Sequence, residues 1–314
     1  MIAIGIDIGG TSIKGAAVYD DGRMLDVFSM PVEKGEPGEV TINKLIDLVE
    51  KYIKEKGIEK EIVGIGFGIP GLLDIKEGIV TYSNNLKWED LHIADMFKAR
   101  LPYPVRIAND ANVAAFGEAK FGAGKGVPYV IMLTLGTGVG GGIVLDGKLY
   151  EGNEGKGAEM GHIVMQYEGR QCSCGRKGCM EAYASATALI RDTKEAMEKH
   201  PESLMHQAAA ELGKVDGRVA FIAARKGDQV ALQVVEQYVY YLCEGILNYC
   251  NIFRPNVVIL SGGIANEGDY LFDKINNYLK IHQYGYPKSP AVKVVPAKLG
   301  YDSGKIGAAS LLFN

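Results

Sequence analysis

Long apolar runs and a surplus of basic residues are both missing from this 314-residue sequence. A helix that spans a bilayer needs about 18 or more consecutive apolar residues, so we expect no membrane partner. The formal net charge is -4, whereas proteins that bind DNA or RNA usually carry an excess of Lys and Arg. We therefore expect no nucleic-acid partner. A small anionic ligand is still compatible, because backbone N–H groups can hold an anion without net positive charge.

Cysteine is also scarce. Three of the five cysteines lie between residues 172 and 179, which is unlike the disulfide framework of a secreted protein. The first ten residues, MIAIGIDIGG, are too short and too rich in glycine for a signal peptide. We therefore expect a cytoplasmic protein.

Glycine, in contrast, is abundant. It accounts for 41 of the 314 residues, about 13% against an average near 7%. The glycines cluster at 9–10, 64–71, 136–142, 152–161 and 262–263. Such clusters between strand-like runs are typical of loops in which the backbone approaches a ligand closely.

Apolar patterns along the chain predict alternating strands and helices. Strands are expected at 2–7, 13–19, 24–30, 62–70, 105–108, 256–262 and 291–297. Helices are expected at 38–56, 91–100, from 110, and at 181–197, 204–225, 229–252 and 303–313. This alternation indicates an α/β fold with mixed sheets, and the length suits two domains.

The middle of the sequence repeats its opening. Residues 4–25 and 131–150 each read as strand, glycine turn, strand, Asp-Gly turn and strand. The repeat predicts a duplicated α/β domain with a cleft between the copies. A chance recurrence of a common hairpin is the alternative.

The glycine turns of the two copies are candidate phosphate-binding loops. In the first, Asp7 is followed by Gly-Gly and Thr11, so backbone N–H groups and a hydroxyl would face phosphate oxygens while Asp7 holds Mg2+. In the second, residues 136–141 match the dinucleotide pattern G-x-G-x-x-G, but a strand follows where that pattern requires a helix. This excludes an NAD-binding unit, and no P-loop pattern occurs. The alternatives are a plain hairpin turn and a glycine-rich bend.

Asp110 is the candidate catalytic base. It lies between Asn109 and Ala111, after a short strand and at the predicted start of a helix. A carboxylate there can accept the proton of a substrate hydroxyl and orient it for in-line attack on phosphorus. A helix N-cap, for which aspartate is common, is the alternative.

One histidine and three cysteines are spaced H-x9-C-x-C-x4-C: His162, Cys172, Cys174 and Cys179. Four such ligands suit a closed tetrahedral zinc site, which would be structural because no coordination position stays open. Free thiols are the alternative. Glu159 and Glu181 flank this loop. Carboxylates that a metal-bound loop holds in place are good acceptors for hydroxyl groups. Ordinary surface glutamates are the alternative for these two.

Together these segments resemble the bacterial ROK-family sugar kinases, within the actin-like ATPase superfamily of hexokinases and heat-shock ATPases. The matching stretches are DIGGTSIKGA (7–16), GIGFGIPGLLD (64–74), ANDANVAAFGEA (108–119), LGTGVGGGIVLDGKLYEGNEGKGAEMGHI (135–163), CSCGRKGCMEAYAS (172–185), VVILSGGI (257–264) and LGYDSGKIGAASL (299–311). They cover the chain from end to end in the order of the family. One departure is Asn84, where many relatives have proline.

The resemblance implies a fold of two actin-like (ribonuclease H-like) domains with mixed sheets and an interdomain cleft. The small N-terminal domain would comprise 1–118 plus 303–314, and the larger domain, 119–302, would carry the zinc loop. The resemblance also implies a homodimer.

The resemblance further assigns roles to residues, with Asp110 as the catalytic base. The sugar-binding positions are Asn85, Asn109, Asp110, Glu159, His162 and Glu181. The ATP-binding positions are Asp7, Gly9, Gly10, Thr11, Lys14, Gly136, Thr137, Gly138, Gly140, Gly262 and Gly263. ATP would act with Mg2+, for which Asp7 is the candidate ligand, and Zn2+ would be structural.

The implied reaction is ATP-dependent phosphorylation of a hexose, glucose to glucose 6-phosphate, because CMEAYASATALIRD resembles the glucokinase branch. Similar chains handle N-acetylmannosamine, N-acetylglucosamine, allose, fructose and β-glucosides, so these stay open. A non-catalytic sugar-sensing regulator and an ATPase acting on protein are the competing functions. A regulator would need an N-terminal helix-turn-helix, for which a phosphate loop at residue 7 leaves no room. The zinc loop and paired glutamates favour a small polyhydroxy ligand over a protein.

Overall fold

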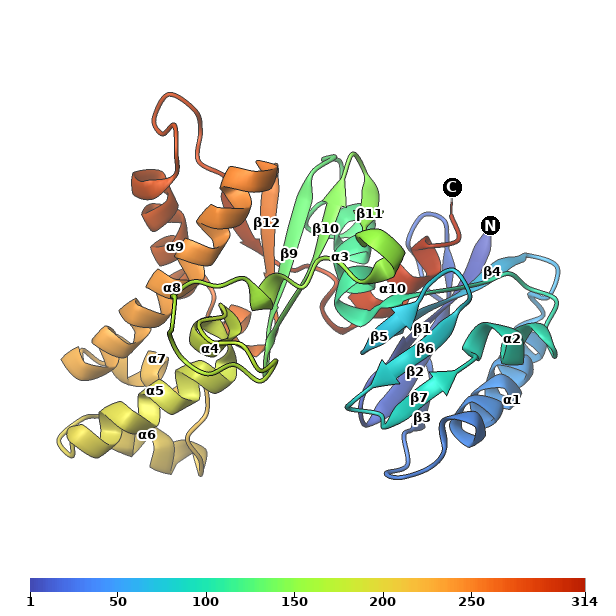
Figure 1. The fold of residues 1–314 in the computed structure, drawn as a ribbon, viewed down its shortest axis with the longest axis horizontal. Coiled ribbons are helices and arrows are strands. Elements are labelled where there is room, and N and C mark those ends of the chain that lie inside the picture. The colour runs from blue at the N-terminus through green and yellow to red at the C-terminus, as the bar shows by residue number, and fades with distance from the viewer. Residues whose placement is uncertain (314) are drawn as a thin grey trace. The chain divides into compact units, whose positions relative to one another are not determined.

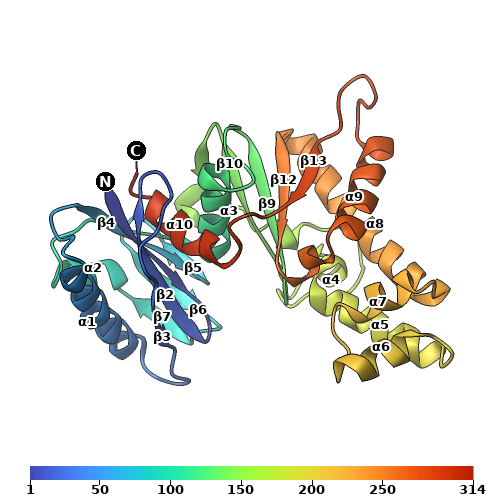
Figure 2. The same ribbon diagram turned by 180° about the vertical axis from the view of Figure 1, so that it is seen from behind.

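The computed structural model describes residues 1–313, which contain two five-stranded sheets, one three-stranded sheet and ten α-helices (Figures 1 and 2). These residues group into two compact units. The first comprises Met1–Pro128, Gly142–Ala158 and the chain from Lys298 onward, and the second comprises Tyr129–Gly141 and Glu159–Ala297. The domain boundaries expected from the sequence stay a prediction.

The first unit is built on a sheet with the order β3-β2-β1-β4-β8. Its strands are β1 (Ile2–Ile8), β2 (Ser12–Tyr19), β3 (Phe28–Pro31), β4 (Ile62–Ile69) and β8 (Val105–Asn109). Strands β1, β4 and β8 run parallel, while β2 pairs antiparallel with β1 and β3. The carboxyl ends of parallel strands meet at one edge of a sheet. Asp7, near the end of β1, and Asn109, at the end of β8, therefore lie at the same edge, with β4 between their strands.

The second five-stranded sheet has the corresponding order, β11-β10-β9-β12-β13. Its strands are β9 (Val130–Leu135), β10 (Val139–Leu145), β11 (Lys148–Tyr150), β12 (Val257–Ser261) and β13 (Lys293–Pro296). Here β12 pairs in parallel with β9 and β13, and β10 pairs antiparallel with β11. The equal strand orders confirm the mixed α/β class and agree with the repeat of the hairpins at 4–25 and 131–150.

Helices cover both faces of the first sheet (Figures 1 and 2). On one face, α1 (Gly38–Lys56) and α2 (Ile93–Lys98) share a core with the sheet. On the other, α10 (Ser303–Ser310) packs on β1, β4 and α3 (Asp110–Phe121). Glycine permits this close approach, because a Cβ atom on Gly5 would lie 1.9 Å from the Lys305 carbonyl oxygen. The backbone of α10 therefore rests directly on the strands.

The second unit carries the other six α-helices of the described residues. They are α4 (Glu181–Ala184), α5 (Ala186–Lys199), α6 (Met205–Leu212), α7 (Val219–Arg225), α8 (Gln229–Phe253) and α9 (Asp269–His282). The long α8 contacts α4, α5, α7 and α9. Short 3-10 turns lie at η1 (Asn153–Gly155), η2 (Met160–His162), η3 (Gly263–Glu267) and η4 (Gly300–Asp302). No helix within residues 1–313 is both long enough and apolar enough to cross a bilayer.

Several predicted elements differ from the structure. The single helix expected at 181–197 is wrong: Ser185 has extended backbone angles, and its hydroxyl accepts the Ala188 N–H at 3.0 Å to start α5. The helix expected at 204–225 is divided because Gly213 adopts the left-handed conformation after α6. The strand at 24–30 is regular only from Phe28. A three-stranded sheet of β5 (Leu72–Asp74), β6 (Ile79–Ser83) and β7 (Trp88–Leu91) was not predicted.

Candidate functional site

The loop between β1 and β2 carries the first of the two predicted phosphate-binding turns. Gly9 N–H donates to the Ser12 carbonyl oxygen at 3.0 Å, and the Thr11 carbonyl accepts from Val32 N–H at 3.0 Å. Apart from Gly10 and its two chain neighbours, no atom of residues 1–313 lies within 4 Å of the position that a Cβ of Gly10 would take. The turn is thus anchored at both ends and open at its glycine tip.

Asp7 lies beside this loop and against the start of α10. A Cβ atom on Gly304 would lie 2.8 Å from the Asp7 carboxyl, and Lys14 is directly opposite Asp7 in the β1–β2 register. Burial raises the pKa of Asp7, and the positive charges of Lys305 and Lys14 partly offset that rise. Asp7 is thus a partly buried carboxylate with two cations nearby.

Lys305 was not identified from the sequence, although it is one of the few buried charges. Its side chain is almost fully buried, and its Nζ donates to the Tyr301 carbonyl at 2.9 Å and pairs with the Asp302 carboxylate at 2.8 Å. Lys305 lies in SGKIGAAS, a stretch of mostly small residues, and nothing in that local pattern indicates that the lysine is buried. Only the contact of α10 with β1 reveals it.

Asn109 and Asp110 share the start of α3. Asn109 is the N-cap, since its Oδ1 accepts from Ala111 N–H at 2.9 Å and from Asn112 N–H at 3.3 Å. Asp110 is the first helical residue, and its Oδ1 accepts from Ala111 N–H at 2.9 Å. The N-cap alternative for Asp110 is therefore wrong. The cap occupies Oδ1 of Asn109, so its Nδ2 is the atom suited to a ligand.

Asn85 lies in the turn between β6 and β7. Its side chain is exposed, whereas the following Leu86 and Trp88 are buried in the core. The neighbouring Asn84 fixes the turn, because its Oδ1 accepts from the Tyr82 hydroxyl at 3.2 Å and from Lys87 Nζ at 3.0 Å. The asparagine that departs from many relatives thus supports the loop that carries Asn85.

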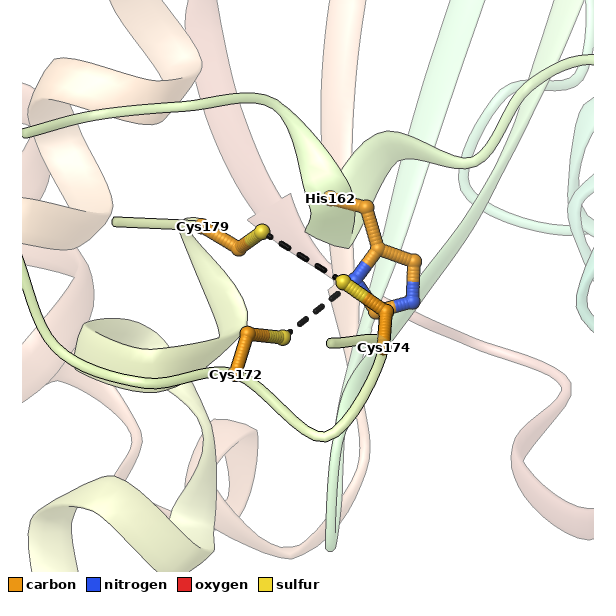
Figure 3. A group of neighbouring side chains, drawn as sticks. All are labelled: His162, Cys172, Cys174 and Cys179. Carbon is orange, nitrogen blue, oxygen red and sulfur yellow. Dashed lines mark hydrogen bonds between the residues drawn. The ribbon is translucent and has the colours of Figure 1, made fainter. Parts of the chain in front are cut away.

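The four predicted metal ligands lie together in the second unit (Figure 3). Their ligand atoms are all within 4.8 Å of one another; the Cys174 and Cys179 sulfurs are 3.7 Å apart, and His162 Nδ1 is 3.6 Å from Cys172 Sγ. In a tetrahedral zinc site with Zn–S of about 2.3 Å and Zn–N of about 2.0 Å, these separations are about 3.8 and 3.5 Å. These two separations fit zinc, and the group could hold this metal with Nδ1 as the imidazole ligand.

Two of these thiols have opposite electrostatic environments. The Arg176 backbone N–H lowers the pKa of Cys174, which is exposed, while burial raises the pKa of Cys179 to about 12. Metal coordination requires both as thiolates. Any bound cation would therefore have to stabilise the Cys179 thiolate strongly.

The two flanking glutamates differ in how far their carboxylates are engaged. Glu159 is exposed at the start of η2. Glu181 Oε1 accepts from the Ser173 hydroxyl at 2.8 Å, and its Oε2 accepts from Val139 N–H at 3.1 Å. Glu181 thus connects the cysteine loop to the glycine-rich turn at 136–138, a link that the sequence did not reveal.

The second glycine-rich turn lies beside Gly262. Gly262 follows β12 with a φ of 92°, and a Cβ there would lie 2.4 Å from the Leu135 carbonyl oxygen. Position 262 therefore requires glycine for both its angle and its space. Because Leu135 precedes Gly136, the predicted phosphate turn and the predicted adenosine-side turn are neighbours in the second unit.

Comparisons with known proteins show which family the sequence belongs to. The sequence matches the ROK family over residues 3–314. It is 37% identical over 313 residues to the glucokinase of Thermotoga maritima, with 98% of this chain and 96% of that protein covered. The crystal structure of a ROK family glucokinase from Streptomyces griseus in complex with glucose and AMPPNP has a TM-score of 0.77 and 34% identity, with 99% of each chain covered.

Regulators are also among the relatives. The xylose repressor of Bacillus subtilis is 28% identical over 313 residues, which cover 99% of this chain and 77% of that protein. The family match spans nearly the whole sequence, and the glucokinase identity exceeds that to the repressor over a similar length. The fold is that of the ROK glucokinase structure, with actin-like units, and the chain belongs to the ROK family.

Proposed function

We propose that this protein is an ATP-dependent hexose kinase that converts glucose to glucose 6-phosphate. The full-length identity to glucokinases supports a sugar substrate and ATP as the phosphoryl donor. The observation that carries the proposal is the place of Asp110: it begins a helix at the carboxyl edge of the sheet, where Asp7 also ends its strand. Base and phosphate loop thus lie at the same edge of one sheet.

In the proposed reaction, Asp110 is the general base. Its carboxylate accepts the proton of the sugar 6-hydroxyl as that oxygen attacks the γ-phosphorus of ATP. The bond between the γ-phosphorus and the bridging oxygen breaks, and ADP leaves with the electron pair. The backbone of α3 holds the carboxylate through Ala111 N–H, so little reorientation is needed.

The two glycine turns would hold the phosphates. N–H groups at Gly10 and around Thr137 would donate to phosphate oxygens, with Thr11 and Lys14 beside the first turn. Mg2+, when bound, would neutralise charge between the phosphates, and Asp7 is its candidate ligand. Gly262 and Gly263 would lie next to the adenosine.

The sugar hydroxyls would meet Asn85, Asn109, Glu159, His162 and Glu181. Coordination of zinc through His162 Nδ1 would leave Nε2 to meet a sugar oxygen. Glu181 has fewer acceptor positions left for sugar hydroxyls. A carboxylate has about four such positions, and bonds from Ser173 and Val139 already occupy two of them. The exposed Glu159 is therefore the stronger hydroxyl acceptor of the pair. Zinc would be structural, and we also propose a homodimer, testable by sedimentation.

A sugar panel tests this function. The purified protein would be given MgATP and each of about ten sugars, and ADP release would be measured by a coupled assay. We expect the highest kcat/KM with glucose. A higher value with N-acetylmannosamine or another hexose would replace glucose as the substrate, and no turnover with any sugar would remove the kinase proposal.

A sugar-sensing regulator is the second candidate, favoured by the match to the xylose repressor. It predicts glucose or xylose binding by calorimetry without turnover. The kinase predicts both binding and ADP release.

A further inference from the structure

The turn at residues 136–138 is fixed by its carbonyl groups. The Gly136 carbonyl accepts Ala186 N–H at 2.9 Å, and the Thr137 carbonyl accepts the Thr187 hydroxyl at 2.7 Å. Both donors belong to the first two residues of α5. Two successive peptide groups of the turn therefore direct their oxygens toward the same helix start.

The direction of the carbonyls determines the direction of the amides. In a planar trans peptide the C=O and the following N–H point to opposite sides. The N–H groups of Thr137 and Gly138 are thus turned away from α5, and neither donates a backbone hydrogen bond among residues 1–313. Successive N–H groups that face the same way form an anion-binding concavity. The bond from the Thr187 hydroxyl to the Thr137 carbonyl therefore fixes the direction of the Gly138 N–H.

Glu181 provides a third attachment, to the far end of the turn. Its Oε2 accepts Val139 N–H at 3.1 Å, while Oε1 is held by the Ser173 hydroxyl at 2.8 Å, between two of the predicted metal ligands. A Cβ on Gly138 would lie 2.2 Å from Oε2. The carboxylate therefore lies against the turn, and a side chain at 138 would have to displace it.

We propose that Thr187 and Glu181 are positioning residues for the nucleotide phosphates, which hold the turn at 136–138 with its N–H groups presented to ATP. The inference rests on the proposed function, because it takes this turn as a phosphate site. It goes further because it gives Thr187 a role. It also makes Glu181 a support of the nucleotide loop, and the predicted metal-binding loop in turn holds Glu181 in place through Ser173.

A second threonine of the same helix provides a matched control. Thr193 is fully buried, and its hydroxyl donates to the Leu189 carbonyl at 2.7 Å, the same length as the bond from Thr187. That bond stays within α5 and does not reach the turn. Thr187, in contrast, is exposed, so its loss should affect the turn more than the stability of the fold.

The experiment measures AMPPNP binding by calorimetry, together with the KM for ATP, in Thr187→Val, Thr187→Ser and Thr193→Val. One hydrogen bond is worth about 1 kcal/mol, which corresponds to about a fivefold weaker affinity. We expect Thr187→Val to weaken AMPPNP binding and raise the KM for ATP about fivefold, with glucose affinity and melting temperature unchanged. Thr187→Ser should restore binding, and Thr193→Val should leave it at the wild-type value.

Ser173→Ala and removal of metal by chelation test the link to the metal loop, and both should weaken AMPPNP binding. Wild-type affinity in Thr187→Val, in a protein that does bind AMPPNP, would overturn the inference and leave the kinase proposal standing. A wild-type protein that binds no AMPPNP would instead overturn the proposed function itself.

Discussion

Glu118 is the buried carboxylate on which the first unit should depend most. It is fully buried in α3, and it accepts three backbone N–H groups: Oε2 from Ala123 at 2.8 Å, and Oε1 from Lys298 at 2.9 Å and Leu299 at 2.6 Å. These donors come from segments about 175 residues apart in the sequence, a separation that follows from their numbers. One side chain therefore fastens the segment that leads into α10, the helix that contacts Asp7.

Glu118→Ala removes all three acceptors and leaves three N–H groups without their partner. A hydrogen bond to a charged group contributes about 1.5–3 kcal/mol, and loss of a buried polar network costs about 3–5 kcal/mol overall. We expect a loss of that size in the free energy of unfolding. Glu118→Gln keeps one oxygen, which can still accept from Lys298 and Leu299, but it turns an NH2 group toward Ala123 N–H. The free energy of unfolding should fall about half as much in Glu118→Gln as in Glu118→Ala.

Urea denaturation followed by circular dichroism, combined with hydrogen exchange, measures this effect. Exchange at Ala123, Lys298 and Leu299 should accelerate in Glu118→Ala, which localises the change even if the two units unfold separately. Glu55→Ala on α1 is the control, because this glutamate is exposed and its ion pair with Lys51 contributes little. A loss in Glu118→Ala no larger than in the control would refute the reasoning.

The other predictions concern the metal, a buried acid and the second turn. Elemental analysis should find about one zinc per chain, and Cys174→Ser should lower both zinc content and melting temperature; a metal-free protein of full activity would contradict the zinc proposal. Burial raises the pKa of Glu151 to about 6, and its Oε1 has no partner within residues 1–313. Because the neutral form is favoured in the folded state, stability is lost as the pH rises through 6; relative to wild type, Glu151→Gln should gain up to about 2 kcal/mol between pH 4 and 7.5. An unchanged difference across that range would show that Glu151 ionises normally. Gly138→Ala should raise the KM for ATP about fivefold, because the added methyl would displace the Glu181 carboxylate from Val139 N–H, and a wild-type KM would disprove that this contact matters.

Local sequence signals determined some elements well. The helix expected at 38–56 has the observed bounds, because its apolar residues repeat at helical spacing and Gly57 ends it in the left-handed conformation. The glycine hairpins were equally clear. The sheet of β5, β6 and β7 was not, since strands of three to five residues leave too short a pattern to separate from loops.

In the candidate site, too, some features could be predicted from local sequence and others could not. The spacing of His162 and the three cysteines predicted their proximity, because short glycine-containing turns leave them few other arrangements. The bond from Glu181 to Val139 and the burial of Lys305 beside Asp7 could not be predicted. Each depends on how segments distant in the sequence pack, and neither residue type signals burial by itself.

The most direct test of the central claim is the turnover of Asp110→Asn with glucose and MgATP. Asparagine keeps an Oδ1 that can accept Ala111 N–H, so the helix start should be preserved while the base is lost. We predict a kcat lower by about two to four powers of ten, with glucose affinity changed only a few-fold. Turnover near the wild-type rate would remove Asp110 from the mechanism and contradict the account of this site.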